Sequence, residues 1–374
     1  MSTVTMAAVA LSLLLGVTTS GQQAETPLPD ALDGVDVVVL VKQGKEVFGK
    51  SAFRSTHEGF AYLFASAENK TEFDQATEKY AIQMGGLCAR MGGTVRGNPS
   101  DYLLHEGRIY IFGSDECRKR FSAAPSKYIP KAVAPMPTES TVVARGQALL
   151  DKAAVAHGGA KLDGLTSYLE TATATQQRQM GPVSIVTKGM WLFPGDARSE
   201  RTFPIPSGTM TVATVLTPAG AFGVGNGGRS MVPPPAAVPY LEATLWRSLI
   251  PVLRVRGEAE VRVAALGTAS VASKTVERVR VTRKGMDVTL NIDPVSGRVL
   301  SWSYADRNPE GEVGEIVVRF DDLRPVDGVL VPFVENAAFN GAPSTTLTRR
   351  LDSAAMNVVL DRSLFIRPET TGAK

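Results

Sequence analysis

The stretch HEGFAYLFASAENKTEFDQATEKY, residues 57–80, is followed by a related stretch, HEGRIYIFGSDECRKRFSAAPSKY, at residues 105–128. The two align without a gap at an offset of 48 residues and are identical at 11 of 24 positions. An internal repeat of this kind indicates a structural unit that has been duplicated. The sequence therefore predicts two tandem copies of one small module.

Each copy has the pattern of a strand followed by a helix. Alternating apolar and aromatic residues after a His-Glu-Gly turn predict the strand. A serine, Ser66 or Ser114, then stands two positions before an acidic residue, Glu68 or Glu116. This spacing is typical of a helix start, where a hydroxyl caps the first amides and a carboxylate suits the dipole. The run VDVVVLV at 35–41 is interpreted as a buried strand.

Composition limits the classes of protein to consider. A chain of 374 residues is too long for one typical core and predicts two or three domains. The apolar fraction of 44% and the charged fraction of 21% are typical of soluble globular proteins. The net charge is only +3, and the one basic tract is 118–120. Nucleic-acid binding is not expected, because it requires a broad basic surface.

The N-terminus contains an apolar run from Met6 to Val17, followed by small and polar residues. Residues 1–21 are therefore predicted to be a signal peptide cleaved near Ser20 or Gly21, which makes the protein periplasmic or otherwise exported. No lysine or arginine precedes the run, so an uncleaved N-terminus that is disordered or membrane-anchoring is the alternative. No cysteine follows the run, and lipoprotein anchoring at this site is not expected.

A proline-containing linker at 132–141 separates the repeats from a second pattern. A helix is predicted to end at His157, where a cation would suit the helix dipole, and Gly158 stops it. Short strand-like runs separated by turns then predict an antiparallel sheet or open barrel. These runs are 168–175, 183–192, 209–216, 261–266, 275–282, 287–292, 299–304, 315–320, 329–339 and 345–351.

Three further segments interrupt these runs. A helix is predicted at 239–255, packed against the sheet, with Pro251 as an expected kink or early end. GVGNGG at 223–228 is predicted to be a flexible loop, because the prolines at 233–235 stop the helix that a nucleotide-binding motif requires. DRNPEGE at 306–312 lacks the last calcium ligand of an EF-hand loop and is predicted to be a hairpin turn.

The repeats, together about 35–131, resemble the YHS domain in their Gly-x-x-Tyr-x-Phe strand, following serine and helix with a closing Pro-x-x-Tyr. The resemblance implies a small metal-binding module with three cysteine ligands. Cys88 matches the upstream cysteine and Cys117 the one at the helix start, whereas Gly113 replaces the middle one. In the first copy Ala65 and Asn69 stand at the two later positions.

Residues of about 142–368 resemble the periplasmic lipoprotein carriers of the LolA/LolB class. The resemblance rests on GMWLFPGDARSERTF, LNIDPVSGRVLSWSY and DDLRPVDGVLVPFVENAAFNG. It implies an unclosed antiparallel barrel whose concave face holds acyl chains. The predicted fold class is thus α+β, with a tandem YHS-like module followed by an open half-barrel covered by helices. Its candidate ligand-binding residues are Trp191, Phe193, Phe222, Trp246 and Trp302.

The two cysteines allow three interpretations. In an oxidising compartment a Cys88–Cys117 disulfide is favoured. The alternatives are a transition metal site formed by Cys88, Cys117 and His105, or two buried free thiols. The histidines of the repeats, His57 and His105, are more readily explained as turn residues with structural hydrogen bonds.

No catalytic residues are predicted. The chain lacks a Gly-x-Ser-x-Gly elbow and a Walker sequence, and it has only three histidines. The function predicted is non-enzymatic binding of a lipid or other apolar molecule in the cell envelope, with the YHS-like module for metal binding or for docking an envelope protein. The alternatives are a copper- or zinc-class metal-handling protein with the barrel as scaffold, and an interaction protein with an oxidised cysteine pair and no ligand.

Overall fold

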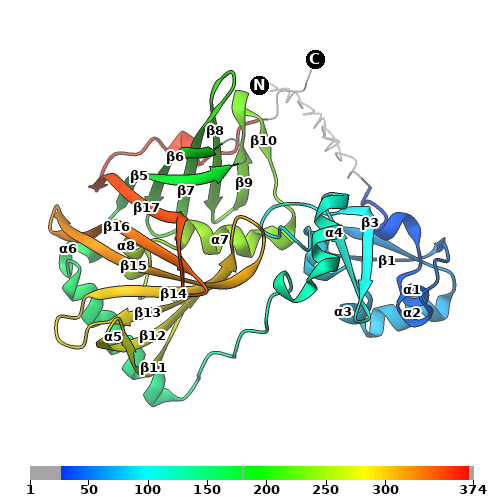
Figure 1. Ribbon diagram of the computed structural model, residues 1–374, viewed down its shortest axis with the longest axis horizontal. Helices are drawn as coiled ribbons and strands as arrows, with labels where there is room; N and C mark the ends of the chain where they lie inside the picture. The colour runs from blue at the N-terminus through cyan, green and yellow to red at the C-terminus, as the bar shows by residue number, and fades with distance from the viewer. Residues whose placement is uncertain (1–26, 179–180, 370–374) are drawn as a thin grey trace, which may run out of the picture.

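The computed structural model describes residues 27–178 and 181–369, so the predicted signal peptide at 1–21 lies outside the described residues. Figure 1 shows two units side by side, a small one in blue and cyan and a larger one in green to red. Residues 131–139 join them without forming a helix or strand. Among the helices in the described ranges, none has the length and hydropathy needed to cross a membrane.

The small unit contains two hairpins, each followed by a helix. The first half consists of η1 (Ala31–Gly34), α1 (Val37–Gln43), β1 (Lys50–His57), β2 (Phe60–Phe64), α2 (Ala67–Gln75) and α3 (Thr77–Tyr80). The second half consists of η2 (Gln83–Gly86), β3 (Asn98–His105), β4 (Arg108–Phe112), α4 (Asp115–Ala123) and η3 (Pro125–Lys127). The predicted capping serines are confirmed, since Ser66 accepts from the Asn69 amide and Ser114 from that of Cys117.

The duplication extends further upstream than the ungapped alignment indicates. A parallel bridge joins Asp30 to Ala61 in the first copy, and one joins Ile82 to Ile109 in the second. The upstream residues of these bridges are 52 positions apart, whereas the downstream residues keep the offset of 48. The first copy therefore contains four additional residues, about one helical turn, between these points.

The prediction of a strand at 35–41 is wrong. Residues 37–43 form α1, in which Val37, Val38, Val39 and Leu40 are buried. The Asp36 side chain caps its N-terminus by accepting from the amides of Val38 and Val39, and Gly44 ends it in the left-handed conformation. A short, fully buried apolar run has no periodicity that separates helix from strand, and here the caps determine the helix.

The large unit is built on one antiparallel sheet of 13 strands in the order β10-β9-β8-β7-β6-β5-β17-β16-β15-β14-β13-β12-β11. The first half in chain order comprises β5 (Ser167–Arg178), β6 (Gly181–Leu192), β7 (Asp196–Ile205), β8 (Gly208–Thr217), β9 (Gly220–Val224) and β10 (Ser230–Met231). The second comprises β11 (Val261–Val271), β12 (Lys274–Arg283), β13 (Met286–Ile292), β14 (Val299–Arg307), β15 (Val313–Val326), β16 (Val329–Phe339) and β17 (Ala342–Met356).

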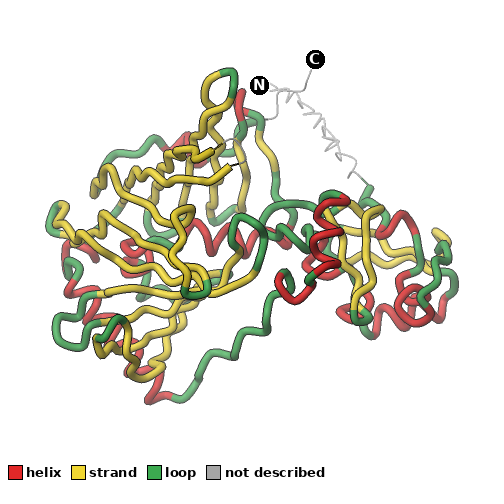
Figure 2. Tube along the Cα trace, viewed as in Figure 1, coloured by secondary structure: helices red, strands yellow, loops and turns green. Residues whose placement is uncertain are grey.

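This sheet is strongly curved and does not close. Helix α7 (Val238–Trp246) contacts β7 and β8 on one side and β13 on the other. From β7 to β13 there are seven steps in the strand order, about 34 Å in a flat sheet, whereas nine helical residues span only about 13 Å. Both walls must therefore fold towards the helix, which lies between them in Figures 1 and 2. The predicted overall architecture, an open antiparallel half-barrel with covering helices, is confirmed.

The two faces of the sheet carry different cores. The concave face packs against α5 (Ser140–Ala156), α6 (Ala160–Asp163), α7 and α8 (Leu249–Arg254) in the largest hydrophobic cluster. The convex face packs under the C-terminal segment containing η6 (Arg362–Phe365). On β5, β6 and β8 neighbouring side chains alternate between these clusters, as Met190 and Trp191 do on β6.

One prediction about local structure needs correction, and one strand was not predicted. The expected loop at 223–228 includes the end of β9 and η4 (Asn226–Gly228), and it joins β9 to β10 at the sheet edge. Strand β7 was not predicted because its sequence, DARSERTFPI, has no continuous apolar run. Its ladders to β6 and β8 form through the backbone, so the polar side chains do not prevent pairing. The predicted turn at 306–312 does connect β14 to β15.

Candidate functional site

The concave interior of the half-barrel contains four of the five predicted ligand-binding residues. Trp191, Trp246 and Trp302 are buried in its cluster, and Phe193 packs against them half-buried. The rings of Phe193 and Trp246 have centroids 6.3 Å apart. Phe222 lies in the convex cluster with Val215 and is therefore separated from the other four by the sheet. The structure brings together Trp191, Phe193, Trp246 and Trp302, but not Phe222.

A charged layer crosses the same interior. Arg349 of β17 binds Glu170 of β5 at 2.7 Å and Glu335 of β16 at 2.6 Å. Glu170 also accepts from the Tyr168 hydroxyl at 2.9 Å, so its two oxygens are both occupied. Burial raises the pKa of Glu335, against the opposing effect of Arg349. The interior is therefore apolar at the tryptophans and polar at this layer.

The junction between α7 and α8 lies at the charged layer. Arg247 binds Asp306 at 2.8 Å and stacks over the Tyr304 ring, and Ser248 donates to Glu170 at 3.3 Å. Both junction residues leave helical geometry to make these contacts. The predicted single helix at 239–255 is thus two helices, and the break is at Arg247–Ser248. Pro251 lies in the first turn of α8, where a missing amide proton is tolerated.

Two indole groups in the interior have no hydrogen-bond partner among the described residues. These are the Nε1 atoms of Trp246 and Trp302, both fully buried. Trp191 differs, since its Nε1 donates to the Leu245 carbonyl at 3.0 Å. A buried donor without an acceptor costs about 1–3 kcal/mol. The unsatisfied donors mark positions in the interior where a ligand oxygen would be stabilised.

The cysteines form a second candidate site, in the small unit. Cys88 and Cys117 are both buried free thiols in one cluster, so the favoured disulfide is absent from this structure. Cys117 is near the N-terminus of α4, and Cys88 follows η2. The two cysteines belong to the same small cluster, and the Cys117 sulfur lies 3.7 Å from the Arg90 Nη1 atom.

The predicted metal triad is not assembled, because His105 is not near the thiols. His105 pairs with Arg108 at the turn end of the β3–β4 hairpin. Cys88 lies beside Gly113, beyond the other end of β4, where an added Cβ at Gly113 would be 3.8 Å from the Cys88 Cβ. Five strand residues separate these points by about 16 Å. In the described part of the chain, no three His, Cys, Asp or Glu side chains are grouped to hold a metal.

The first copy has an equivalent site that the sequence did not reveal. Asp36 corresponds to Cys88, and Asn69 corresponds to Cys117. The buried Asp36 carboxylate accepts from the Asn69 side-chain amide at 2.8 Å and from the Ala65 backbone amide at 2.7 Å. Asp36 was missed because the offset between the copies changes from 48 to 52 upstream of α1. The one sequence signal is the shared pattern of a glycine, an apolar residue and the ligand-type residue, GVD and GLC.

The cysteine loop is attached to the half-barrel by Arg307. Its guanidinium donates to the carbonyls of Arg90 at 2.9 Å, Gly311 at 2.6 Å and Tyr128 at 2.8 Å. An added Cβ at Gly311 would lie 2.4 Å from the Arg90 carbonyl oxygen, so the backbones are in close contact. The β14–β15 turn therefore docks directly on the second copy of the repeat.

The histidines have structural positions. His157 follows α5 as its C-cap, but its ring accepts from the Val299 amide at 3.1 Å and pairs with the Leu330 carbonyl at 2.9 Å. Burial lowers the pKa of His157, which corrects the prediction of a cation at this helix end. His57 and His105 end the first strand of each hairpin and lie 3.8 Å from a glutamate of their turns, Glu58 and Glu106. The buried Nε2 of His57 has no hydrogen-bond partner among the described residues, so the structural hydrogen bond predicted for it is not formed at this atom.

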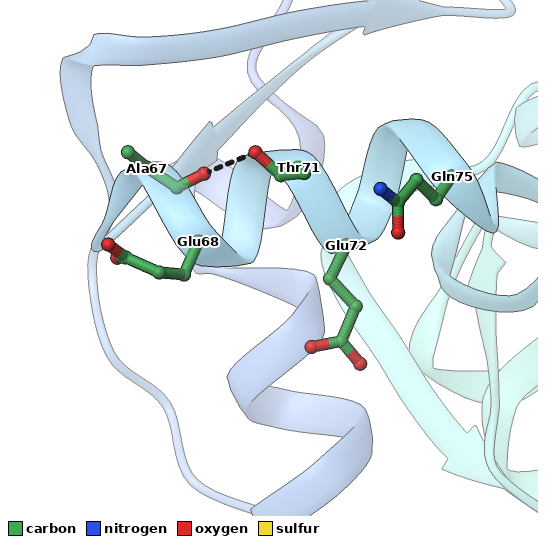
Figure 3. A pocket seen from close by; sticks show the side chains of 5 residues that line it. All are labelled: Ala67, Glu68, Thr71, Glu72 and Gln75. Atoms are coloured by element: carbon green, nitrogen blue, oxygen red, sulfur yellow. Dashed lines mark hydrogen bonds between the residues drawn. The ribbon is translucent and has the colours of Figure 1, made fainter.

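A hollow beside α2, shown in Figure 3, is lined by Ala67, Glu68, Thr71, Glu72 and Gln75. Thr71 donates to the Ala67 carbonyl within the helix. The Glu72 carboxylate is bound by Lys42 and by the Tyr80 hydroxyl. Thr71 and Glu72 thus already form hydrogen bonds within the small unit, and we interpret the hollow as a solvated helix face.

Known proteins resemble this chain only at the level of distant structure. No family model matches the sequence, and no curated protein matches it. A domain from Vibrio parahaemolyticus described as an outer membrane lipoprotein-sorting protein has a TM-score of 0.40 and 10% identity, covering 60% of this chain and 97% of its own. A DUF1329 family protein from Desulfovibrio piger has a TM-score of 0.40 and 11% identity, with the same coverage. A LolA superfamily protein from Nitrosomonas europaea has a TM-score of 0.39 and 9% identity, covering 59% and 97%. Likenesses this distant do not establish what this chain binds.

Proposed function

We propose that the protein is a non-enzymatic binding protein of the cell envelope that holds a lipid or other apolar ligand in the concave interior of its half-barrel. The small unit provides a docking surface for an envelope partner. The carrying observation is the interior itself, where three tryptophans belong to one hydrophobic cluster and two of their buried indole donors have no acceptor among the described residues.

The chemistry of the interior matches an amphipathic molecule. Acyl carbons would replace the side chains of α7 and α8 that now fill the space around Trp191 and Trp302. An ester or carboxyl oxygen of the ligand would accept from the Trp246 or Trp302 indole and remove the cost of the unpaired donor. The break at Arg247–Ser248 is held by contacts of both residues with the sheet, to Asp306 and Glu170.

The three tryptophans of the chain all lie in this interior, which makes their fluorescence a specific test. A fatty acid with bromine atoms on its acyl chain should quench tryptophan emission in the full chain and reach saturation. The unbrominated acid of the same length should compete and restore emission. Quenching that grows linearly with concentration, or that competitor does not reverse, would contradict the proposal.

Variants locate the binding site. Trp302→Phe keeps an aromatic ring but removes a donor, and it should weaken binding several-fold if the indole contacts the ligand. Phe222→Leu is the matched control, because Phe222 lies in the buried cluster on the convex face. Equal effects of the two variants would place the ligand outside the concave interior. Native mass spectrometry of protein purified from its own envelope fraction then identifies the ligand class.

A further inference from the structure

We propose that Cys117 and Cys88 form a redox-active dithiol, in which Cys117 attacks an oxidant of the disulfide class and Cys88 resolves the mixed disulfide. This site lies in the small unit and is independent of the apolar ligand proposed for the half-barrel. The structure holds its reduced form, with both thiols free.

The surroundings of Cys117 suit an attacking thiolate. It is the third residue of the nine-residue helix α4, where the helix dipole favours a negative charge. The Arg90 Nη1 atom lies 3.7 Å from its sulfur, and the buried Nε of the same guanidinium has no hydrogen-bond partner among the described residues. A cation is thus placed at this sulfur with few competing contacts.

The two thiols differ in acidity in the direction that the proposal requires. Burial alone would raise the pKa of Cys117, but hydrogen bonds from Ser114, Arg90 and Cys88 outweigh it and lower the pKa. Burial raises the pKa of Cys88. Cys117 also remains 8% exposed, whereas Cys88 is completely buried. The outer cysteine is therefore the nucleophile and the inner one is the resolving thiol.

The reaction balances as two exchange steps. The Cys117 thiolate attacks one sulfur of a disulfide RSSR, forms a Cys117–SR bond and releases RS⁻. Cys88 then loses its proton to the released thiolate and attacks the Cys117 sulfur, which forms the Cys88–Cys117 bond and releases a second RS⁻. In total, two cysteine thiols are oxidised and RSSR is reduced to two thiols.

The first copy of the repeat shows that the fold does not require thiols here. The equivalent residues Asp36 and Asn69 fill the same place with a carboxylate–amide hydrogen bond of 2.8 Å. No guanidinium is available at the matching position, since Arg90 corresponds to Val38 in the helix α1. The second copy thus differs from the first by two thiols and an arginine, the set of groups that activates a cysteine.

The test uses the full chain and oxidised glutathione, read by intact mass under native conditions. The wild-type protein should lose two hydrogens and carry no adduct. Cys88→Ser should retain one glutathione on Cys117, and Cys117→Ser should remain unmodified. An unreactive Cys88→Ser variant, or one that reacts no faster folded than in urea, overturns the proposal. So does a wild-type protein whose thiols are masked by a bound metal until a chelator is added.

Arg90 gives a second measurement. In the Cys88→Ser background, Arg90→Gln should slow glutathione addition about tenfold at neutral pH, the change in thiolate fraction for one pKa unit. Arg96→Gln is the matched control, because Arg96 is exposed on the same loop. The pH dependence of the rate in Cys88→Ser should have its midpoint below the ordinary thiol value of 9.0. Equal rates for the two arginine variants, or a midpoint at or above that value, contradict the assigned role, and circular dichroism establishes that each variant is folded.

Discussion

The two copies of the repeat have the same backbone plan but different chemistry at one buried position. In the first copy a carboxylate at Asp36 accepts four hydrogen bonds, from Val38, Val39, Ala65 and Asn69. In the second copy a thiol at Cys88 occupies this place beside Cys117, with Arg90 close by. The carboxylate of the first copy accepts from amide donors that would otherwise be unpaired, and its role is to stabilise the fold. The second leaves weaker, polarisable groups that can react.

The difference also has a structural cause in the loops. The first copy uses its four additional residues to extend one turn into α1, which the Asp36 side chain caps. The second copy keeps only the first turn, marked by the bond from the Gly92 amide to the Cys88 carbonyl at 2.7 Å. Gly92 and Gly93 then have positive φ, and Arg307 of the half-barrel packs against Gly92. Because the loop of the second copy is shorter, the surface at Gly92 is accessible to Arg307, and the second copy contacts the large unit there.

The largest expected effect comes from removing the buried group in each copy. Asp36→Ala should cost about 3–5 kcal/mol of unfolding free energy, because it leaves several buried amides without an acceptor. Cys88→Ala should cost about 1–2 kcal/mol, since it removes mainly packing. Urea unfolding measures both. Equal losses would mean that the carboxylate is not what distinguishes the first copy.

The next test converts the second copy into the first. Cys88→Asp alone should cost about 3 kcal/mol, because the buried carboxylate faces the Cys117 sulfur. Adding Cys117→Asn should recover about 1–3 kcal/mol through the amide donor seen at Asn69. A double-mutant cycle from urea unfolding measures the coupling. Additive losses would show that the two pockets are not equivalent.

A smaller difference is expected at the matched glycines Gly49 and Gly97. A Cβ at Gly49 would lie 2.2 Å from the Leu63 carbonyl carbon, whereas one at Gly97 would lie 2.3 Å from the Ile111 Cγ1 atom. Gly49→Ala should cost about 2–3 kcal/mol and Gly97→Ala about 1 kcal/mol, because a side chain moves more easily than a backbone. Thermal unfolding of the two variants compares them, and the reverse order would contradict this explanation.

The smallest effect is expected at the hairpin turns. Glu58 and Glu106 both have positive φ before a glycine, a conformation that asparagine adopts more readily. Glu58→Asn and Glu106→Asn should each stabilise the protein by about 0.5 kcal/mol. Calorimetry of both variants checks that the gains are equal. Unequal gains would show that the turns differ in their surroundings although their backbones match.

Sequence periodicity was most informative for the sheet. The antiparallel pairing and the open half-barrel follow from many short strand-like runs separated by turns, because short turns join strands that pair as antiparallel neighbours. It was least informative where polar contacts decide the structure. Strand β7 has no continuous apolar run in its first seven residues, and the break between α7 and α8 depends on Asp306 and Glu170, which are distant in sequence.

The sequence by itself determined that a module is duplicated, that its helices begin at Ser66 and Ser114, and that an antiparallel sheet follows. These features depend on residues close together in the chain. Only the tertiary structure decided that Asp36 is the counterpart of Cys88, that His105 is remote from both thiols, and that Phe222 faces away from the tryptophans. The physical reason is that a four-residue extension changes the register of the copies and each step along a strand reverses the side-chain direction. Burial, charge and reactivity at these positions follow from contacts between distant segments.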